Sequence, residues 1–212
     1  MVQELALTSF AQWIHSVFYS MDYAALEWFH AFAQTPFGRI CAPILNAVTL
    51  TGWKGAFLIL VSLVLILFRK TRKSGICALL ALAIGALFTN LIVKNAVARP
   101  RPYDFDATLR IWWEYAGSHF ESDYCFPSGH MTAACAFTTG FVLSRGKKWV
   151  IPGVVYVLLM GISRMFLIVH YPSDILGGLI FGCCAGIVSF FIVKAIYLKW
   201  GKTKLLSENA AV

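Results

Sequence analysis

The chain of 212 residues is strongly apolar: 59% of the residues are hydrophobic, 13% are charged and the mean hydropathy is +0.71. This composition excludes an ordinary soluble domain of this size and favours one polytopic membrane domain over residues 1–212. The net charge of +8 falls in short basic clusters between apolar runs, which argues against nucleic-acid binding. The six cysteines lack C-x-x-C spacing, which argues against a zinc site or a disulfide framework.

The N-terminal region, residues 1–35, is predicted to lie at the membrane surface. Residues 3–20 have the pattern of an amphipathic surface helix. They show no basic leader and no apolar run followed by a small-residue cleavage site, so a cleaved signal peptide is not expected. A weak apolar segment follows between about 24 and 50, and three residues interrupt it: Pro36, Arg39 and Pro43. The pattern therefore leaves the start and tilt of this segment open.

Five later apolar runs are long enough to cross the hydrocarbon core of a bilayer as helices. They lie near residues 54–69, 75–98, 128–144, 149–169 and 173–198. Together with the weak segment they predict an all-α fold, a polytopic membrane helix bundle of about six transmembrane helices with an N-terminal amphipathic helix. The catalytic helical core is expected within residues 50–198.

Basic residues mark one side of this predicted bundle. Two links and the C-terminal tail carry them: Arg69, Lys70, Arg72, Lys73, Arg145, Lys147, Lys148, Lys199, Lys202 and Lys204. All lie on the same side if the spans alternate, and the positive-inside rule makes that side cytoplasmic. The loop over 99–127 and the turn at Tyr171 and Pro172 then face outward, so we expect any site at the outer helix ends.

The first polar cluster lies where the run over 75–98 reaches this outer side. Lys94 and Arg101 would lie near the same membrane depth, and Pro102 is one of two prolines that stop the helix. Basic residues at helix ends commonly snorkel to the interface. Cations on the outer end nevertheless run against positive-inside statistics. The cluster alone therefore leaves a snorkelling role and a functional site equally open.

The second cluster, Pro127 to His130, opens the run over 128–144. Ser128 can cap this helix, and Gly129 lets an anion approach the free amides at the positive end of the helix dipole. His130 lies one turn inside, beside any anion bound there. An ordinary serine cap with an interfacial histidine explains the same four residues, so this motif is ambiguous in isolation.

The third cluster spans the end of one helix and the start of the next. Arg164 lies about two turns inside an apolar run, where a charge needs an anion or a partner, although helical spacing places Ser163 rather than Arg164 on the face of His170. Asp174 follows Pro172 in the next helix and is expected to accept a hydrogen bond from Nδ1–H of His170. A structural His–Asp pair is the alternative, but all three clusters fall on one side of the membrane.

The three clusters together resemble the three-part signature of the type 2 phosphatidic acid phosphatase superfamily. The pattern K-x6-R-P begins at Lys94, P-S-G-H ends at His130, and S-R-x5-H-x3-D runs from Ser163 to Asp174, with no departure at a motif position. The motifs and spans cover about residues 50–195. An ordered match in three parts is far more specific than one short motif.

The resemblance implies a metal-independent phosphatase without a cofactor, in which His170 attacks phosphorus and forms a phosphohistidine. Asp174 would orient His170, and His130 would protonate the leaving oxygen and then help to activate water. The implied phosphate-binding residues are Lys94, Arg101, Ser128, Gly129 and Arg164. These roles agree with phosphoryl transfer by positioning and charge stabilisation. Five acids share one loop but look like solvated surface rather than a metal-binding cluster: Asp104, Asp106, Glu114, Glu121 and Asp123.

The expected partner is a lipid phosphate in a bacterial plasma membrane, with the site on the extracytoplasmic side and with no nucleic acid or obligate protein partner. Undecaprenyl pyrophosphate is the favoured substrate by analogy with short bacterial members, and phosphatidylglycerophosphate or phosphatidic acid is the alternative. A soluble phosphate ester and a non-catalytic protein that binds or transports anionic lipids also stay open. The neighbours of Cys125 do not decide whether its thiol is reactive or merely buried.

Overall fold

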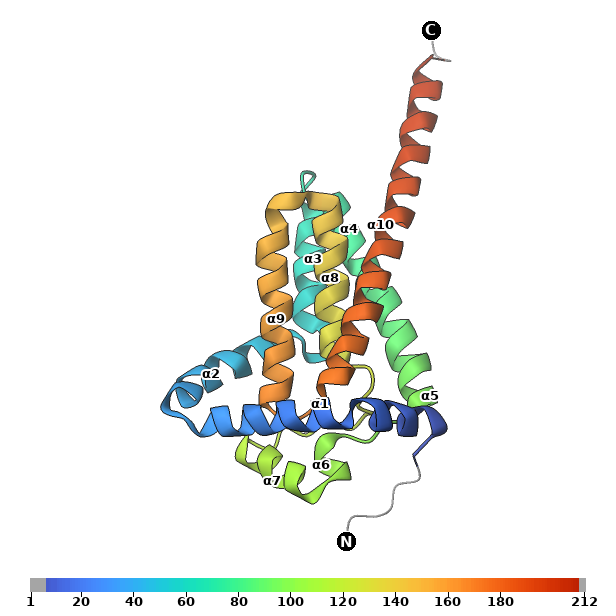
Figure 1. The fold of residues 1–212 in the computed structure, drawn as a ribbon. Coiled ribbons are helices and arrows are strands. Elements are labelled where there is room, and N and C mark those ends of the chain that lie inside the picture. The colour runs from blue at the N-terminus through green and yellow to red at the C-terminus, as the bar shows by residue number, and fades with distance from the viewer. Residues whose placement is uncertain (1–6, 210–212) are drawn as a thin grey trace.

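The computed structural model describes residues 7–209, and this part of the chain forms helices and no strand (Figure 1). Five helices stand side by side as an upright bundle. They are α3 (Ala56–Leu67), α4 (Arg72–Ala86), α8 (Gly129–Arg145), α9 (Val150–Phe166) and α10 (Pro172–Asn209). The prediction of an all-α membrane bundle is confirmed.

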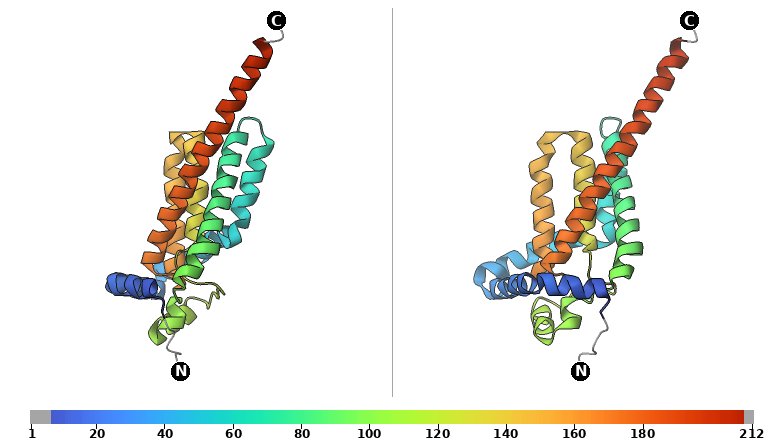
Figure 2. Two further views of the ribbon diagram at one scale, coloured as in Figure 1. Left: turned by 90° about the vertical axis from the view of Figure 1, so that its right-hand side faces the viewer. Right: turned by 45° about the vertical axis from the view of Figure 1, so that its right-hand side comes forward.

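Two N-terminal helices lie across one end of this bundle rather than within it (Figure 2). Helix α1 (Ser9–Gln34) begins at the cap Thr8, and α2 (Pro36–Thr51) begins at the cap Thr35 with proline in its first turn. The surface helix predicted over 3–20 thus continues to Gln34, and residues 1–6 lie outside the described part. The weak segment expected near 24–50 is not one helix, because the chain turns at Thr35.

Three helical stretches are long and apolar enough to cross a membrane: Arg72–Phe105, Lys147–Phe166 and Pro172–Lys199. A fourth span results if Pro36–Thr51 and Trp53–Leu67, which are bent by 48° at their junction, count as one. The first stretch contains α4, a π-helical segment at Leu87–Val93, α5 (Lys94–Val97) and α6 (Pro102–Phe105). The expected count of about six spans therefore stays a prediction.

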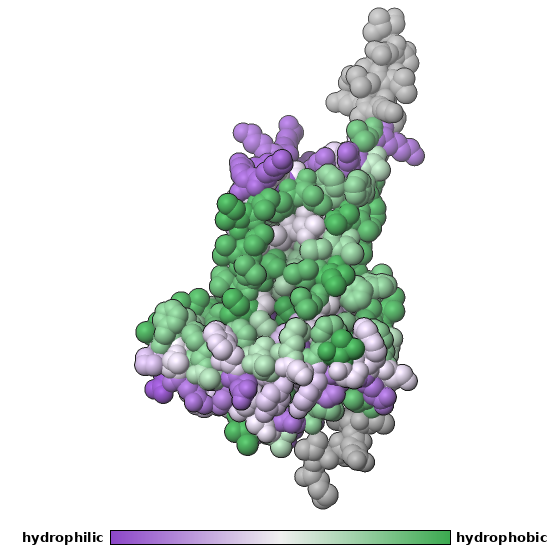
Figure 3. All heavy atoms as spheres, viewed as in Figure 1, coloured by the Kyte–Doolittle hydropathy of each residue, from purple (hydrophilic) through white to green (hydrophobic). Residues whose placement is uncertain are grey.

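The outer surface of the upright bundle is an apolar band between two hydrophilic ends (Figure 3). One end carries the short connection between α8 and α9, where Lys147 and Lys148 are exposed. The opposite end carries α1 and α7 (Ala107–Tyr115). Because lipid-facing surface must be apolar, the band shows how the bundle is embedded.

Small residues bring α8 and α10 into close contact. Gly178, Gly182 and Gly186 recur every four residues along α10, which places them on one face of the helix. A Cβ at Gly182 would lie 2.6 Å from the carbonyl oxygen of Thr132, and one at Gly186 would lie 2.9 Å from the amide nitrogen of Gly140. The two backbones therefore approach as in other small-residue membrane interfaces. This contact fixes the beginning of α8 against the beginning of α10.

Replacing Gly182 with valine will separate these two helices, because its Cβ has no room beside the α8 backbone. We expect a loss of about 1–3 kcal/mol, the usual cost of overpacking a close interface. Thermal unfolding in detergent measures it. Cys184→Val adds bulk on the exposed side of the same helix and should melt like the wild type. A Gly182→Val protein with wild-type stability would contradict the close contact.

Candidate active site

The three sequence clusters meet at the end of the bundle beside α1. Helix α5 ends at Ala98, which has a left-handed conformation with φ of 50°, and the chain then extends until Pro102 begins α6. This change of direction carries Arg101 across to the third cluster. Arg101 Nη1 donates to the carbonyl oxygen of Val169 at 2.9 Å and lies 3.4 Å from His170 Nε2.

The second cluster begins α8 directly against the start of α10. Ser128 caps α8 as expected, since its hydroxyl accepts from the amide of Met131, and its own amide donates to the carbonyl oxygen of Asp174 at 3.1 Å. A Cβ at Gly129 would lie 3.9 Å from Lys94 Cε. The amide end of α8 and the Lys94 side chain therefore lie next to each other.

Arg164 is buried and reaches the same place from α9. Its Nη1 donates to the hydroxyl of Thr49 at 2.7 Å and lies 3.5 Å from His130 Nε2. Its Nε–H is buried and has no acceptor among the described residues. Arg164 thus reaches around its helix as the site requires, and it retains a free donor beside His130.

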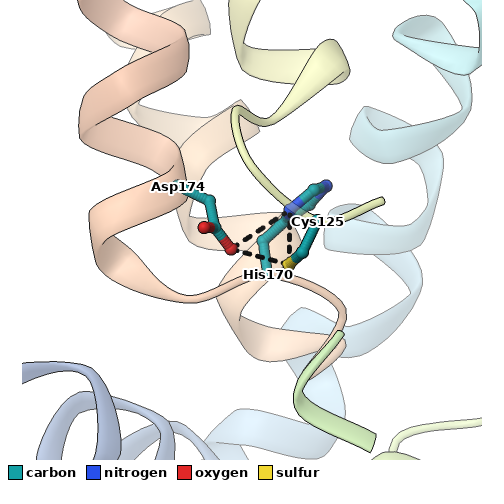
Figure 4. Close-up of side chains that lie close together, drawn as sticks. All are labelled: Cys125, His170 and Asp174. Atoms are coloured by element: carbon teal, nitrogen blue, oxygen red, sulfur yellow. Dashed lines mark hydrogen bonds and ion pairs between the residues drawn. The ribbon is translucent and has the colours of Figure 1, made fainter. Parts of the chain in front are cut away.

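His170 lies in the turn between α9 and α10, against Cys125 and Asp174 (Figure 4). The two atoms of the predicted hydrogen bond, His170 Nδ1 and Asp174 Oδ2, are in contact at 3.6 Å, slightly longer than a normal hydrogen bond. The Cys125 thiol binds the same carboxylate oxygen: it donates to Asp174 Oδ2 at 2.7 Å and lies 3.4 Å from His170 Nδ1. Burial, and then the Asp174 carboxylate, raises the pKa of Cys125 well above its usual range, so the sulfur retains the proton that it donates.

Asp174 has a second buried partner that sequence reasoning missed. Arg99 Nη1 donates to Asp174 Oδ1 at 2.6 Å, and Arg99 Nη2 donates to Asp22 of α1 at 2.8 Å. The three side chains are nearly inaccessible to solvent. Arg99 was visible only as a further cation on the outer side, and no short-range pattern connects Asp22 with it.

Two acids of the loop before α8 pair with the three cations that are predicted to bind phosphate, which corrects the prediction that these acids are solvated surface. Asp123 accepts from Lys94 at 2.6 Å and from Arg101, and Glu121 accepts from Arg164. Although burial opposes the change, Lys94 and then Arg101 lower the pKa of Asp123 to about 2. The two loop carboxylates therefore neutralise Lys94, Arg101 and Arg164 in this structure.

The group formed by Cys125, His170 and Asp174 has residue types that can bind a metal. In this structure the thiol and the carboxylate are hydrogen-bonded to each other at 2.7 Å. The guanidinium groups of Arg99 and Arg101 border the group and oppose a cation.

Two cavities open beside the cations and His130. One of about 1220 Å³ is lined by Lys94, Arg99, Arg101 and the neighbouring loop. The other, of about 440 Å³, runs between α3, α4 and α8, and its walls include Ile59, Leu82, Gly129 and His130. Asn90 and residues 121–123 line both cavities. One cavity thus reaches Lys94 and Arg101 from the polar end and the other reaches His130 from the apolar side of the bundle, whereas His170 and Arg164 line neither cavity.

Two curated relatives each match somewhat more than half of this chain. A phosphatidylglycerophosphatase B from Bacillus subtilis is 36% identical over 138 residues, which cover 60% of this chain and 59% of the relative. An undecaprenyl-diphosphatase from Sulfolobus acidocaldarius is 32% identical over 125 residues, covering 58% and 56%. The chain thus spans somewhat more than half the length of these curated relatives.

A solved structure and a family profile extend the comparison. The crystal structure of a transmembrane PAP2-type phosphatidylglycerolphosphate phosphatase from Bacillus subtilis aligns with a TM-score of 0.64 at 25% identity, covering 90% of this chain and 91% of that chain. The profile described as PAP2 superfamily matches residues 74–197, more than half of the chain. The predicted resemblance is confirmed, and the chain belongs to the PAP2 superfamily.

Proposed function

We propose that this protein is an integral membrane phosphatase of the bacterial plasma membrane that removes phosphate from a lipid phosphomonoester or pyrophosphate. The observation that carries the proposal is the proximity of two histidines and three buried cations at one end of the bundle. Arg101 Nη1 lies 3.4 Å from His170 Nε2, Arg164 Nη1 lies 3.5 Å from His130 Nε2, and Asp123 pairs with both Lys94 and Arg101. Paired cations and positioned imidazoles are what phosphoryl transfer requires.

In the proposed first step, Nε2 of His170 attacks phosphorus. The new N–P bond forms as the bond from phosphorus to the lipid oxygen breaks, and His130 protonates the leaving oxygen. Arg101, 3.4 Å from Nε2, is placed to neutralise the phosphoryl oxygens beside the nucleophile. Asp174 supports the imidazole as positive charge develops on it.

In the second step, water attacks phosphorus of the phosphohistidine. His130 takes a proton from the water, the N–P bond breaks and its electron pair returns to His170. Inorganic phosphate then leaves. The charge stabilisation in both steps comes from the cations and from the amide end of α8 at Ser128 and Gly129, so we propose that the reaction needs no metal.

The apolar cavity supports a lipid substrate. It passes between the membrane-embedded surfaces of α3 and α4 and ends at His130, which is the group proposed to protonate the lipid oxygen. A headgroup at the site could therefore keep its tail in the hydrocarbon region. The exposed basic residues at the opposite end of the bundle, such as Lys147 and Lys148, support an extracytoplasmic site.

Positive charge on both sides of the loop over 121–123 favours a substrate with two phosphate groups. Lys54 lines the apolar cavity, and Arg110 lines the polar one. Undecaprenyl pyrophosphate remains our first candidate. Phosphatidylglycerophosphate also carries two phosphates, and the relative that is 36% identical bears its name, so it is the second candidate.

The first test is phosphate release in detergent with EDTA present. We expect release by the wild type and a loss of about 10⁴-fold or more in His170→Ala, the scale expected when a catalytic nucleophile is removed. The wild type should also form an acid-labile phosphoenzyme, which His170→Ala should lack. His30→Ala removes a histidine that stacks on Trp112 outside the site and should retain activity. Abolition of turnover by EDTA would contradict the metal-independent mechanism.

The carboxylate of Asp123 offers a second test, because in the proposed reaction the substrate displaces it from Lys94 and Arg101. Its low pKa keeps Asp123 ionised at ordinary assay pH, and the stability it contributes is present above its unfolded pKa and lost as pH falls through about 2. Asp123→Asn should lower the melting temperature by about 2–4 °C, since it leaves cations unpaired. Orthovanadate should raise that temperature more in the variant than in the wild type.

The control for this test is Asp104→Asn, which removes a half-exposed acid paired with Arg110 at 3.6 Å. It should leave both the melting temperature and the vanadate response close to wild type. Equal vanadate stabilisation of Asp123→Asn and the wild type would show that the carboxylate does not compete for the anion site.

Substrate preference provides a third test. Undecaprenyl pyrophosphate and phosphatidylglycerophosphate should each exceed phosphatidic acid in kcat/KM by about tenfold, the factor that corresponds to roughly 1.4 kcal/mol. Lys54→Gln should narrow this difference, whereas Lys70→Gln at the opposite end of the bundle should preserve it. Equal hydrolysis of all three lipids would count against a second phosphate subsite.

A further inference from the structure

A continuous chain of buried charges links the interfacial helix α1 with His170. Asp22 projects from α1 and is 1% exposed, Arg99 is 2% exposed and Asp174 is 0% exposed. Arg99 donates to Asp22 at 2.8 Å and to Asp174 at 2.6 Å, so its guanidinium group joins the two carboxylates. The far oxygen of Asp174 lies 3.6 Å from His170 Nδ1.

Ser173 locks the geometry of this chain at the first turn of α10. Its amide donates to Asp22 Oδ1 at 2.9 Å, and its hydroxyl is 2.6 Å from Asp22 Oδ2 and accepts from Arg99 at 2.7 Å. The guanidinium also lies over the ring of Tyr171 at 4.0 Å. Every polar atom of the Asp22 carboxylate is thereby used inside the protein, which removes the freedom of α1 to slide over the site.

Arg99 divides the two oxygens of Asp174 between different tasks. Oδ1 binds Arg99, while Oδ2 faces His170 and accepts from the amide of Tyr171 at 2.8 Å and from the thiol of Cys125. A carboxylate held at both oxygens cannot rotate away from the imidazole. Arg99 pairs with both Asp22 and Asp174. Because two carboxylates face one guanidinium, these three side chains together carry a net negative charge near His170.

We propose that Asp22 and Arg99 are positioning residues of the active site, which hold Asp174 toward His170 and make the interfacial helix α1 a functional part of the site. The inference rests on the proposed phosphatase function, since it assigns roles around the same nucleophile. Asp22 lies outside residues 74–197, over which the family profile matches. Helix α1 exposes Phe10, Trp13 and Trp28, so the same helix also has an apolar surface for the membrane interface.

The test compares Asp22→Asn with Arg99→Gln on one lipid phosphate. The Nη atoms of Arg99 are bonded to Ser173, Asp174 and Asp22, and Asp22 is enclosed, so both residues act through Asp174. We therefore expect kcat to fall by about 10- to 100-fold in each variant, on the scale seen when groups that orient a reactive histidine are lost. KM should change by less than about threefold.

The pH profile separates a positioning role from a merely structural one. Several ionisable groups surround His170 from the packed elements: Asp22, Lys94, Arg99, Arg101, Glu121, Asp123, Cys125, His130, Arg164 and Asp174. Asp22→Asn removes a negative charge from this set, so the acid limb of kcat/KM should move to lower pH. Arg99→Gln removes a positive charge, so the limb should move to higher pH.

Two control substitutions on α1 are compared with Asp22→Asn and leave the Asp22, Arg99 and Asp174 side chains unchanged. Glu27→Gln removes an exposed carboxylate and should behave like the wild type, while Leu26→Ala loosens the buried face and should lower stability without moving the acid limb. As a third control, Arg99→Lys retains the positive charge, so the acid limb of kcat/KM should stay at its wild-type pH.

Opposite shifts in Asp22→Asn and Arg99→Gln, absent from the controls, support the proposal. Wild-type kcat and pH profile in Asp22→Asn, or a lowered kcat with the acid limb at its wild-type pH, would overturn it. A folded wild type that hydrolyses none of the lipids would overturn the phosphatase proposal itself, and this failure is distinct because it precedes any comparison of variants.

Discussion

Buried positive charge at one end of an apolar bundle is the constraint on which the rest of this structure depends. Lys94, Arg99, Arg101 and Arg164 are each exposed by 3% or less, in a protein whose outer surface is largely hydrocarbon-like. An uncompensated charge in such a place is very costly. Each cation therefore meets an anion, and the helix ends and loops are arranged so that the anions can reach them.

The anions that pair with these cations are of two kinds: some are enclosed in the protein and others are partly exposed on a loop. Arg99 pairs with Asp22 and Asp174, which are both fully enclosed and cannot be exchanged for a ligand. The other three cations pair with Glu121 and Asp123, whose side chains are 25% and 50% exposed on a loop. In the proposed reaction a phosphate group replaces these loop acids without leaving a buried charge unpaired, whereas the Arg99 pairs are part of the fold.

This division also explains how far the sequence predicts the site. Lys94, Ser128, His130, Arg164 and Asp174 lie at or near helix ends, so helical spacing and alternating topology were enough to bring them to one side. Asp22 and Arg99 are separated by 77 residues, and their contact depends on α1 crossing the end of the bundle. No periodicity encodes that crossing.

The loop acids escaped prediction for a related reason. Glu121 and Asp123 stand in an irregular segment, where composition alone gives no direction for a side chain and solvated surface is the usual expectation. The extent of α1 was also misjudged, because the cap at Thr35 rather than a change in hydropathy ends it. The class of fold followed from the apolar runs, while the direction of its first helices depended on local capping.

The exchangeable carboxylates have a consequence for turnover in the proposed cycle. Cations strong enough to hold a phosphoryl group in the transition state also hold inorganic phosphate after hydrolysis, and tight product binding would slow each round. When Glu121 and Asp123 return to Arg164, Lys94 and Arg101, they compensate the cations that the departing phosphate would otherwise leave bare. In the proposed cycle, the carboxylates that weaken ground-state binding also assist release, so the loop and the cations together set the affinity of the site for phosphate.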